Sequence, residues 1–329
     1  MLCPRDLDGC GLRAAGEGAA VSAAAVPALR AWRPLLPLLL LWLALGGAVP
    51  PLRAQAIVIH DDRGSEFRFE RPPQRIVTML PSLTETAWVL GVGPRLVGVD
   101  RYSNWPPEVA ALPHLGGLED AQIEAIAALA PDLVLASISS RAMDRLQALG
   151  LRVARFRSES HADVRHTVER VARLLGREAE SVRVLARIER ELDAAAARVP
   201  AALRGARVYF EIGGGPYAAG ASSFIGQTLT RLALVNVVPA ELGPFPKLNP
   251  EFVVRARPEL IIGVQRELAS IAQRPGWASI PAVRQGRLCG FETTTYDLLV
   301  RPGPRMGEAA GLLVDCMLRV QGEQKAAPR

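Results

Sequence analysis

Three loops rich in aromatic residues, glycine and proline carry the residue types best suited to binding a large, flat ligand. They run from Asp100 to Pro107, from Gly213 to Tyr217 and from Gly243 to Pro246. Aromatic rings held by prolines offer rigid apolar faces, and consecutive glycines let a ligand approach the backbone closely. The predicted ligand-binding residues are Tyr102, Trp105, Gly214, Gly215, Tyr217 and Phe245. Aromatic residues that only fill the cores of their loops are the alternative interpretation.

A weaker candidate for the same site is Asp297, which follows the apolar run that ends at Phe291. Its carboxylate could accept a hydrogen bond from an amide of the ligand. A solvated loop acid is the simpler interpretation.

Two glutamates stand in a repeated pattern. Glu124 and Glu251, 127 positions apart, are each followed by six residues and then by proline, an acid and leucine. Because proline lacks an N–H and restricts the residue before it, each pattern predicts a short helix that ends there and is followed by a strand. A single helical glutamate is usually a solvated charge. One glutamate on the matching helix of each half provides two symmetric anionic points, which suits docking to a dimeric partner with basic pockets.

Catalytic and metal-binding motifs are missing from the sequence. It contains no G-x-S-x-G, no G-x-x-x-x-G-K-[ST] and no H-E-x-x-H. The four histidines, at positions 60, 114, 161 and 166, share no ligand spacing. We therefore predict no catalytic residues, no metal ligands and no cofactor. The alternative of another class is a periplasmic hydrolase or metal-dependent enzyme on a two-lobed scaffold, which turnover of an ester, phosphate or peptide would support.

The elements that position these residues form two α/β halves built on one plan. Arg75 and Arg207 each open a strand-like run that ends in a turn. Ser82 and Glu85 fit a capping box, in which both side chains satisfy free N–H groups at a helix start. Strands are predicted at 75–80, 96–99, 132–137, 207–212 and 287–291, and further helices at 82–90, 222–234 and 304–320.

A long helical stretch separates the two halves. Apolar residues recur at three- and four-residue steps from Val164 to Leu192, and Gly176 permits a break. We predict a spine helix over 162–200 that joins an N-terminal lobe, 57–161, to a C-terminal lobe, 201–329.

The N-terminal residues are typical of a secretory signal. Arg30 and Arg33 precede a leucine-rich run, and Ala54-Gln55-Ala56 forms a small-residue cleavage site. We predict a signal peptide over 1–56, with an over-extended start, and a periplasmic location; a single anchoring helix is the alternative. Removing this segment takes away five Arg and three acids and lowers the net charge from +6 to +4, so nucleic-acid binding is not indicated. Of the remaining cysteines, Cys289 and Cys316 could pair or lie buried as separate thiols.

Several motifs together resemble the class III periplasmic substrate-binding proteins of ABC importers, which have a helical backbone, and within them the vitamin B12-binding members. The resemblance covers residues 57–322. It rests on Arg75-Ile-Val-Thr-Met-Leu-Pro81-Ser-Leu-Thr-Glu85, Val99-x-x-Tyr102-Ser103-x-x-Pro106-Pro107, the segments Glu124 to Val134 and Glu251 to Pro258, the Gly213 loop, and Arg301-Pro-Gly-Pro304-Arg305.

This resemblance implies two Rossmann-like lobes joined by a long backbone helix, with the ligand cleft between the lobes. It implies that Glu124 and Glu251 contact arginines of a permease dimer, which works with a cytoplasmic ATPase, and that Tyr102 lines a corrin site. Phe245 falls where vitamin B12-binding members have a tryptophan, whereas Leu118 departs from an expected tryptophan. The expected protein is a monomer that captures a corrinoid, and ferric siderophores and haem are the alternative ligands.

Overall fold

The computed structural model describes residues 56–326. The predicted signal peptide therefore lies outside the described residues, apart from Ala56. No helix among residues 56–326 is both long and apolar enough to span a membrane.

The N-terminal lobe is built on a parallel sheet of four strands. In spatial order they are β4 (Leu96–Val99), β3 (Ile76–Thr78), β5 (Leu133–Ser137) and β6 (Val153–Phe156). These strands are apolar runs buried on both faces, as parallel sheets require. An antiparallel hairpin of β1 (Ile57–His60) and β2 (Glu66–Phe69) precedes the sheet. The helices of this lobe are α2 (Pro81–Val89), α3 (Ile123–Ala128), α4 (Met143–Ala148) and α5 (His161–Leu175).

The C-terminal lobe repeats this plan. Its sheet has the spatial order β11 (Leu288–Phe291), β10 (Leu260–Val264), β7 (Arg207–Ile212) and β8 (Tyr217–Ala218), and β9 (Val235–Asn236) also pairs with β7. All of these pairings are parallel except that of β8 with β7. Its helices are α7 (Phe224–Arg231), α8 (Pro250–Ala256), α9 (Gln265–Leu268), α10 (Pro281–Arg284) and α11 (Thr293–Leu299). The predicted two-lobed α/β fold is confirmed.

The repeated glutamate pattern corresponds to matching helix-to-strand units, α3 with β5 and α8 with β10. In each unit the residue before the proline, Ala130 or Arg257, has a left-handed backbone with φ of 43° or 48°. The acid after the proline caps the neighbouring strand: Asp132 Oδ2 accepts from the Arg75 N–H (2.9 Å) and Glu259 Oε2 from the Arg207 N–H (3.0 Å). The repeated pattern therefore corresponds to the same hydrogen bond, from the first residue of a strand run to the acid after the proline, in both lobes.

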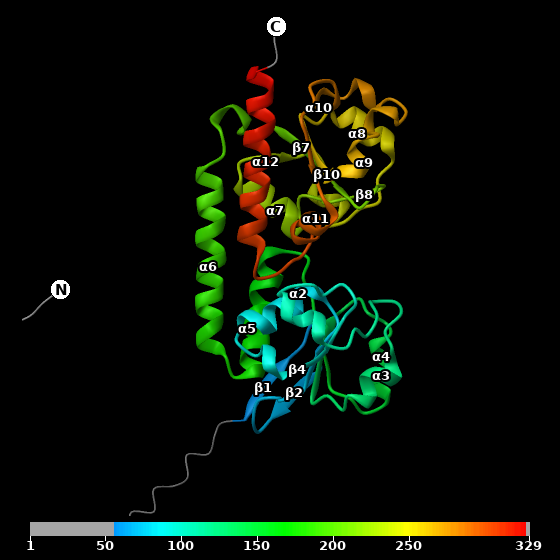
Figure 1. The fold of residues 1–329 in the computed structure, drawn as a ribbon, viewed down its shortest axis with the longest axis vertical. Coiled ribbons are helices and arrows are strands. Elements are labelled where there is room, and N and C mark those ends of the chain that lie inside the picture. The colour runs from blue at the N-terminus through cyan, green and yellow to red at the C-terminus, as the bar shows by residue number, and fades with distance from the viewer. Residues whose placement is uncertain (1–55, 327–329) are drawn as a thin grey trace, which may run out of the picture. The chain divides into compact units, whose positions relative to one another are not determined.

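The predicted spine region contains two helices, which are separated at the position where the sequence permits a break. The α5 helix ends at Gly176, whose φ of 66° is left-handed, and α6 (Glu178–Ala197) begins two residues later. The α5 helix packs on α2 and β1 of the N-terminal lobe, whereas α6 runs beside α12 (Met306–Ala326) (Figure 1). One buried apolar core extends through these helices into both lobes, so the lobes share packing as well as chain connections.

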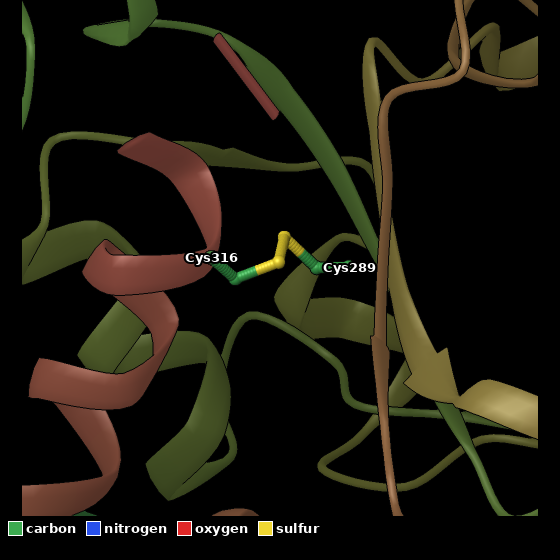
Figure 2. Close-up of a disulfide and its surroundings, with 2 residues drawn as sticks. All are labelled: Cys289 and Cys316. Atoms are coloured by element: carbon green, nitrogen blue, oxygen red, sulfur yellow. A yellow bond between two sulfur atoms is a disulfide. The ribbon is translucent and has the colours of Figure 1, made fainter. Parts of the chain in front are cut away.

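A disulfide joins Cys289 on β11 to Cys316 on α12 (Figure 2). Both side chains are buried. The bond ties the edge strand of the C-terminal sheet to the helix that packs on α6, and it resolves the two alternatives that the cysteine spacing leaves open.

His161 at the start of α5 contacts the C-terminal lobe. Its Nε2 lies 3.0 Å from the Phe224 carbonyl oxygen and 2.9 Å from Thr228 Oγ1, while Gln227 Oε1 accepts from its backbone N–H (2.8 Å). Burial lowers the pKa of His161 and nearby Arg231 lowers it further, whereas the Phe224 hydrogen bond and Glu189 raise it. The neutral imidazole therefore fits this contact.

The lowered pKa of His161 predicts a loss of stability on acidification. A group whose pKa is depressed by folding contributes stability that is present above its unfolded pKa, near 6.5, and is lost as pH falls through the folded value. His161→Gln should remove this part of the pH dependence. Thermal unfolding at pH 7.5 and pH 5 checks this, because the drop in Tm between the two pH values should be smaller in His161→Gln than in the wild-type protein. His166→Gln is the control and should keep the wild-type drop. An equal drop in Tm in the two variants would contradict the prediction.

Candidate ligand-binding site

A pocket of about 500 Å³ opens on the N-terminal lobe at the carboxyl ends of β3 and β4. Such ends are where parallel α/β sheets bind ligands. Three short segments line it: Met79–Pro81, Asp100–Tyr102 and Gly117–Asp120. The Tyr102 side chain is 61% exposed here, and a Cβ on Gly117 would lie only 3.1 Å from its ring. Glycine at position 117 therefore leaves room for the tyrosine.

A buried hydrogen-bond network supports Tyr102 from below. Asp100 Oδ1 accepts from the Tyr102 N–H (2.8 Å), and Asp100 Oδ2 accepts from Ser103 Oγ (2.5 Å). Ser103 Oγ also lies 2.7 Å from Thr84 Oγ1, which in turn lies 2.7 Å from Thr78 Oγ1. Burial raises the pKa of Asp100, against the opposing effect of these hydrogen bonds. These buried hydrogen bonds therefore fix the backbone that carries the exposed Tyr102 ring.

A second pocket, of about 290 Å³, opens on the C-terminal lobe at the end of β7. Its walls are largely apolar and include the predicted residues Gly214 and Gly215 together with Pro216, Leu248, Val253 and Trp277. At its base, Arg274 donates to both carboxylate oxygens of Glu211 (2.5 and 3.0 Å), whose side chain is only 1% exposed. Arg274 also lies 4.8 Å from the Trp277 ring centroid. Because its charges are paired, this pocket suits an apolar group of a ligand.

The α11 helix and the residues just after it hold the loops of both pockets. Tyr296 donates its hydroxyl to the Glu211 carbonyl (2.7 Å) and accepts from the Gly213 N–H (3.1 Å). Just beyond the same helix, Arg301 Nη2 donates to the Tyr102 carbonyl (3.0 Å). The first and second predicted loops therefore border one region, although they come from different lobes.

The other predicted aromatic residues, Tyr217, Phe245 and Trp105, are not among the residues that line the two pockets. The third loop lies beside the second, since Ala218 donates to the Pro246 carbonyl (3.1 Å). Tyr217 and Phe245 are both partly exposed, and the Phe245 ring lies 6.1 Å from that of Phe224. Trp105 lies against Arg305, with 4.6 Å between guanidinium and ring centroid, and is not among the residues that line the two pockets.

Asp297 is engaged with Arg301 rather than solvated alone, at an Oδ2 to Nη2 distance of 3.5 Å. Burial raises its pKa and Arg301 opposes that effect. Its carboxylate is partly exposed, so it retains accepting capacity toward a ligand.

The predicted capping box is wrong. The α2 helix begins at Pro81, so Ser82 lies inside its first turn, and the N-cap Leu80 makes no side-chain cap. Glu85 is instead buried and accepts from Arg301 Nη1 (3.1 Å). Burial raises the pKa of Glu85, and the two arginines at 301 and 305 oppose this rise. This contact between lobes spans 216 positions, and the only hint in the sequence is the pair of arginines around Pro302-Gly303-Pro304.

Glu124 and Glu251 occupy equivalent, exposed positions. Each lies in the first turn of its helix, α3 or α8, and the side chains are 85% and 77% exposed. Each is 3.6 Å from one arginine, Arg145 or Arg255. Exposed pairs at this distance contribute little stability, so both carboxylates are available to a partner.

No cluster of three or more histidine, cysteine or acidic side chains that could hold a metal ion occurs within residues 56–326. The geometry is that of a binding site with paired charges, apolar walls and backbone groups.

A family model described as periplasmic binding protein matches residues 76–292. The chain belongs to this family. It is a binding protein and not an enzyme, as predicted from the missing catalytic motifs. The two pockets described above are accordingly the candidate ligand site of a periplasmic binding protein.

Known proteins of this kind are similar over most of the chain. An uncharacterized ABC transporter substrate-binding lipoprotein, YvrC of Bacillus subtilis, is 25% identical over 79% of this chain and 84% of its own length. The cobalamin-binding protein of Halobacterium salinarum is 29% identical over 61% of this chain, a match that spans 57% of that relative. The solved structure of the periplasmic heme-binding protein RhuT from Roseiflexus sp. RS-1 is 27% identical, with a TM-score of 0.65 over 75% of this chain and 98% of RhuT.

Proposed function

We propose that this protein is the substrate-binding component of an ABC importer and that it captures a corrinoid, vitamin B12, in the periplasm. The observation that carries the proposal is the pair of pockets at the carboxyl ends of the two sheets, whose loops are both held by α11 and the residues just after it. The similarity to a cobalamin-binding protein supports the choice of ligand.

The two pockets differ in a way that suits a corrinoid. A corrin ring is broad and amphipathic, with an amide fringe, so its site needs an aromatic face together with polar groups at the edge. Tyr102 supplies an exposed ring, and Asp297, Gly214 and Gly215 offer a carboxylate and accessible backbone. Phe245 and Tyr217 lie beside the glycine loop and extend the apolar surface. Trp105 would affect ligand binding indirectly, by its contact with Arg305 and through the loop that carries Tyr102, and not by direct contact with the ligand.

Calorimetry with cyanocobalamin tests the proposal. We expect binding of one molecule per protein, and Tyr102→Ala should weaken it by about tenfold or more, because buried aromatic contacts are the usual energetic centres of binding sites. Leu149→Ala, an exposed apolar residue of the same lobe outside both pockets, serves as the matched control. The absence of heat with cyanocobalamin at micromolar protein, together with clear binding of haemin or a ferric siderophore, would overturn the corrinoid assignment.

Haem is the second candidate ligand, because RhuT is described as a heme-binding protein and shares 27% identity with this chain. The exposed Tyr102 hydroxyl is the group that would reach a haem iron, since phenolate is one of the protein ligands that haem accepts. A Soret band that shifts on haemin addition and is lost in Tyr102→Phe would support haem, whereas cyanocobalamin binding that survives in Tyr102→Phe would support a corrinoid.

Delivery is proposed to depend on Glu124 and Glu251. Their equivalent positions, high exposure and weak internal pairing suit two basic pockets on a permease dimer, which would be driven by a cytoplasmic ATPase. The proposed function also includes secretion to the periplasm, directed by residues 1–56. The protein is proposed to act as a monomer.

A further inference from the structure

The segment between α11 and α12 carries two arginines that reach from the C-terminal lobe into the N-terminal lobe. Arg301 is only 9% exposed. It donates to Asn104 Oδ1 (2.7 Å), to the Tyr102 carbonyl (3.0 Å) and to Glu85 Oε1 (3.1 Å). One guanidinium therefore ties the C-terminal lobe to a helix and a loop of the other lobe.

Arg305 strengthens this connection at the far end of the same loop. It lies 4.6 Å from the Trp105 ring centroid and 3.7 Å from Glu85 Oε1. Glu308 orients it by accepting two hydrogen bonds of 2.8 Å. Residues of the C-terminal lobe thus contact both ends of the loop from Tyr102 to Trp105, Arg301 at the first end and Arg305 at the second.

The backbone of Tyr102 is held by both lobes at once. Its N–H donates to Asp100 of its own lobe, and its carbonyl accepts from Arg301 of the other. The orientation of the exposed ring, which depends on both peptide groups, is therefore set jointly by the two lobes. Arg301 itself is not among the residues that line the N-terminal pocket.

We infer that Arg301 is a positioning residue, which acts through Tyr102 and Asn104 to hold the aromatic face of the N-terminal pocket in the geometry that binds ligand. Arginine suits this role because its planar fork presents several donors in fixed directions, whereas lysine offers a single point charge. A site that is preformed in this way avoids the entropic cost of ordering the loop on binding. The part of this inference that concerns affinity rests on the proposed function.

Hydrogen–deuterium exchange of the ligand-free protein tests the positioning without any ligand. Arg301→Lys keeps the charge beside Glu85 but loses the fork, and Asn104→Ala removes one acceptor from an exposed residue that is not part of the core. We expect faster exchange of the amides in residues 100–107 in both variants. Arg231→Lys, which removes a comparable fork from Glu189 and Asp193 elsewhere, should leave these amides unchanged. Unchanged exchange at 100–107 in Arg301→Lys and Asn104→Ala would overturn the inference.

Cyanocobalamin binding then separates positioning from direct contact with the ligand. If Arg301 acts through the loop, Arg301→Lys should weaken binding by about tenfold. Adding Asn104→Ala should weaken it by less than about twofold more, because both changes remove the same hydrogen bond between Arg301 and Asn104. Fully additive losses would mean that Arg301 touches the ligand directly, which overturns the positioning role. If the wild-type protein does not bind cyanocobalamin, the proposed ligand fails, and the exchange experiment alone decides the role of Arg301.

Discussion

Reversing both exposed glutamates, Glu124→Lys with Glu251→Lys, is expected to reduce corrinoid uptake to the background of a strain that lacks this protein. A lysine facing a basic pocket replaces an attraction by a repulsion that costs several kcal/mol, and a change of about 3 kcal/mol already weakens docking more than a hundredfold. Uptake of labelled cyanocobalamin by cells that carry only the variant measures the effect.

Ligand capture should survive this double reversal, because neither glutamate lines the pocket on its own lobe. Calorimetry of the purified variant should return the wild-type affinity. A matched control reverses Glu169 and Glu241, two exposed glutamates of the same two lobes, and should transport normally. If Glu124→Lys with Glu251→Lys still supports uptake at the wild-type rate, the two glutamates are only surface charges.

The fold could be predicted from the sequence wherever a local signal determines the structure. Pro131 and Pro258 end short helices, and the apolar runs after them can only be buried strands, so β5 and β10 appear where they are expected. The repeated acids, Asp132 and Glu259, cap the adjacent strands in the same way in both lobes. The repeat therefore predicted the helix-to-strand units, whereas the pairing of their strands with β3 and β7 appears only in the structure.

Predictions were wrong where a local pattern competes with a distant partner. Ser82 and Glu85 have the spacing of a capping box, yet Glu85 bonds to Arg301, 216 positions away, and no local rule contains that contact. The helical stretch between the lobes shows the opposite case, because Gly176 permits a break in the sequence pattern and takes a left-handed conformation that separates α5 from α6.

The candidate site was predictable in composition more than in geometry. The loops at 100–107 and 213–217 each contribute residues to one pocket, whereas the loop at 243–246 lines neither of the two and Trp105 lies against Arg305. The buried pair of Glu211 and Arg274 was missed, since neither residue stands in a recognisable motif. Its only sequence signal is an acid at the end of a buried strand, where solvation is not available.

Removing the disulfide is expected to lower the stability of the protein by several kcal/mol. The bond closes a loop of 27 residues between β11 and α12, for which the chain-entropy model gives about 3.5 kcal/mol. Within residues 56–326, β11 is an edge strand that pairs with β10 alone, and the disulfide adds a covalent link to α12. We expect Cys289→Ala with Cys316→Ala to lower the Tm by roughly 6 °C in calorimetric unfolding, given the usual entropy of unfolding for a chain of this size.

A reductant separates the effect of the bond from the effect of the two truncated side chains. Dithiothreitol should lower the Tm of the wild-type protein toward that of the double variant and leave the variant unchanged, because no other cysteine occurs within residues 57–329. Since α12 begins directly after Arg305, loosening its anchor on β11 should also speed hydrogen exchange in residues 301–305, whereas the parallel strands β3 and β5 of the other lobe should exchange as before. Alkylation of both thiols in the untreated wild-type protein, with a Tm that does not respond to reductant, would show that the two cysteines are not paired.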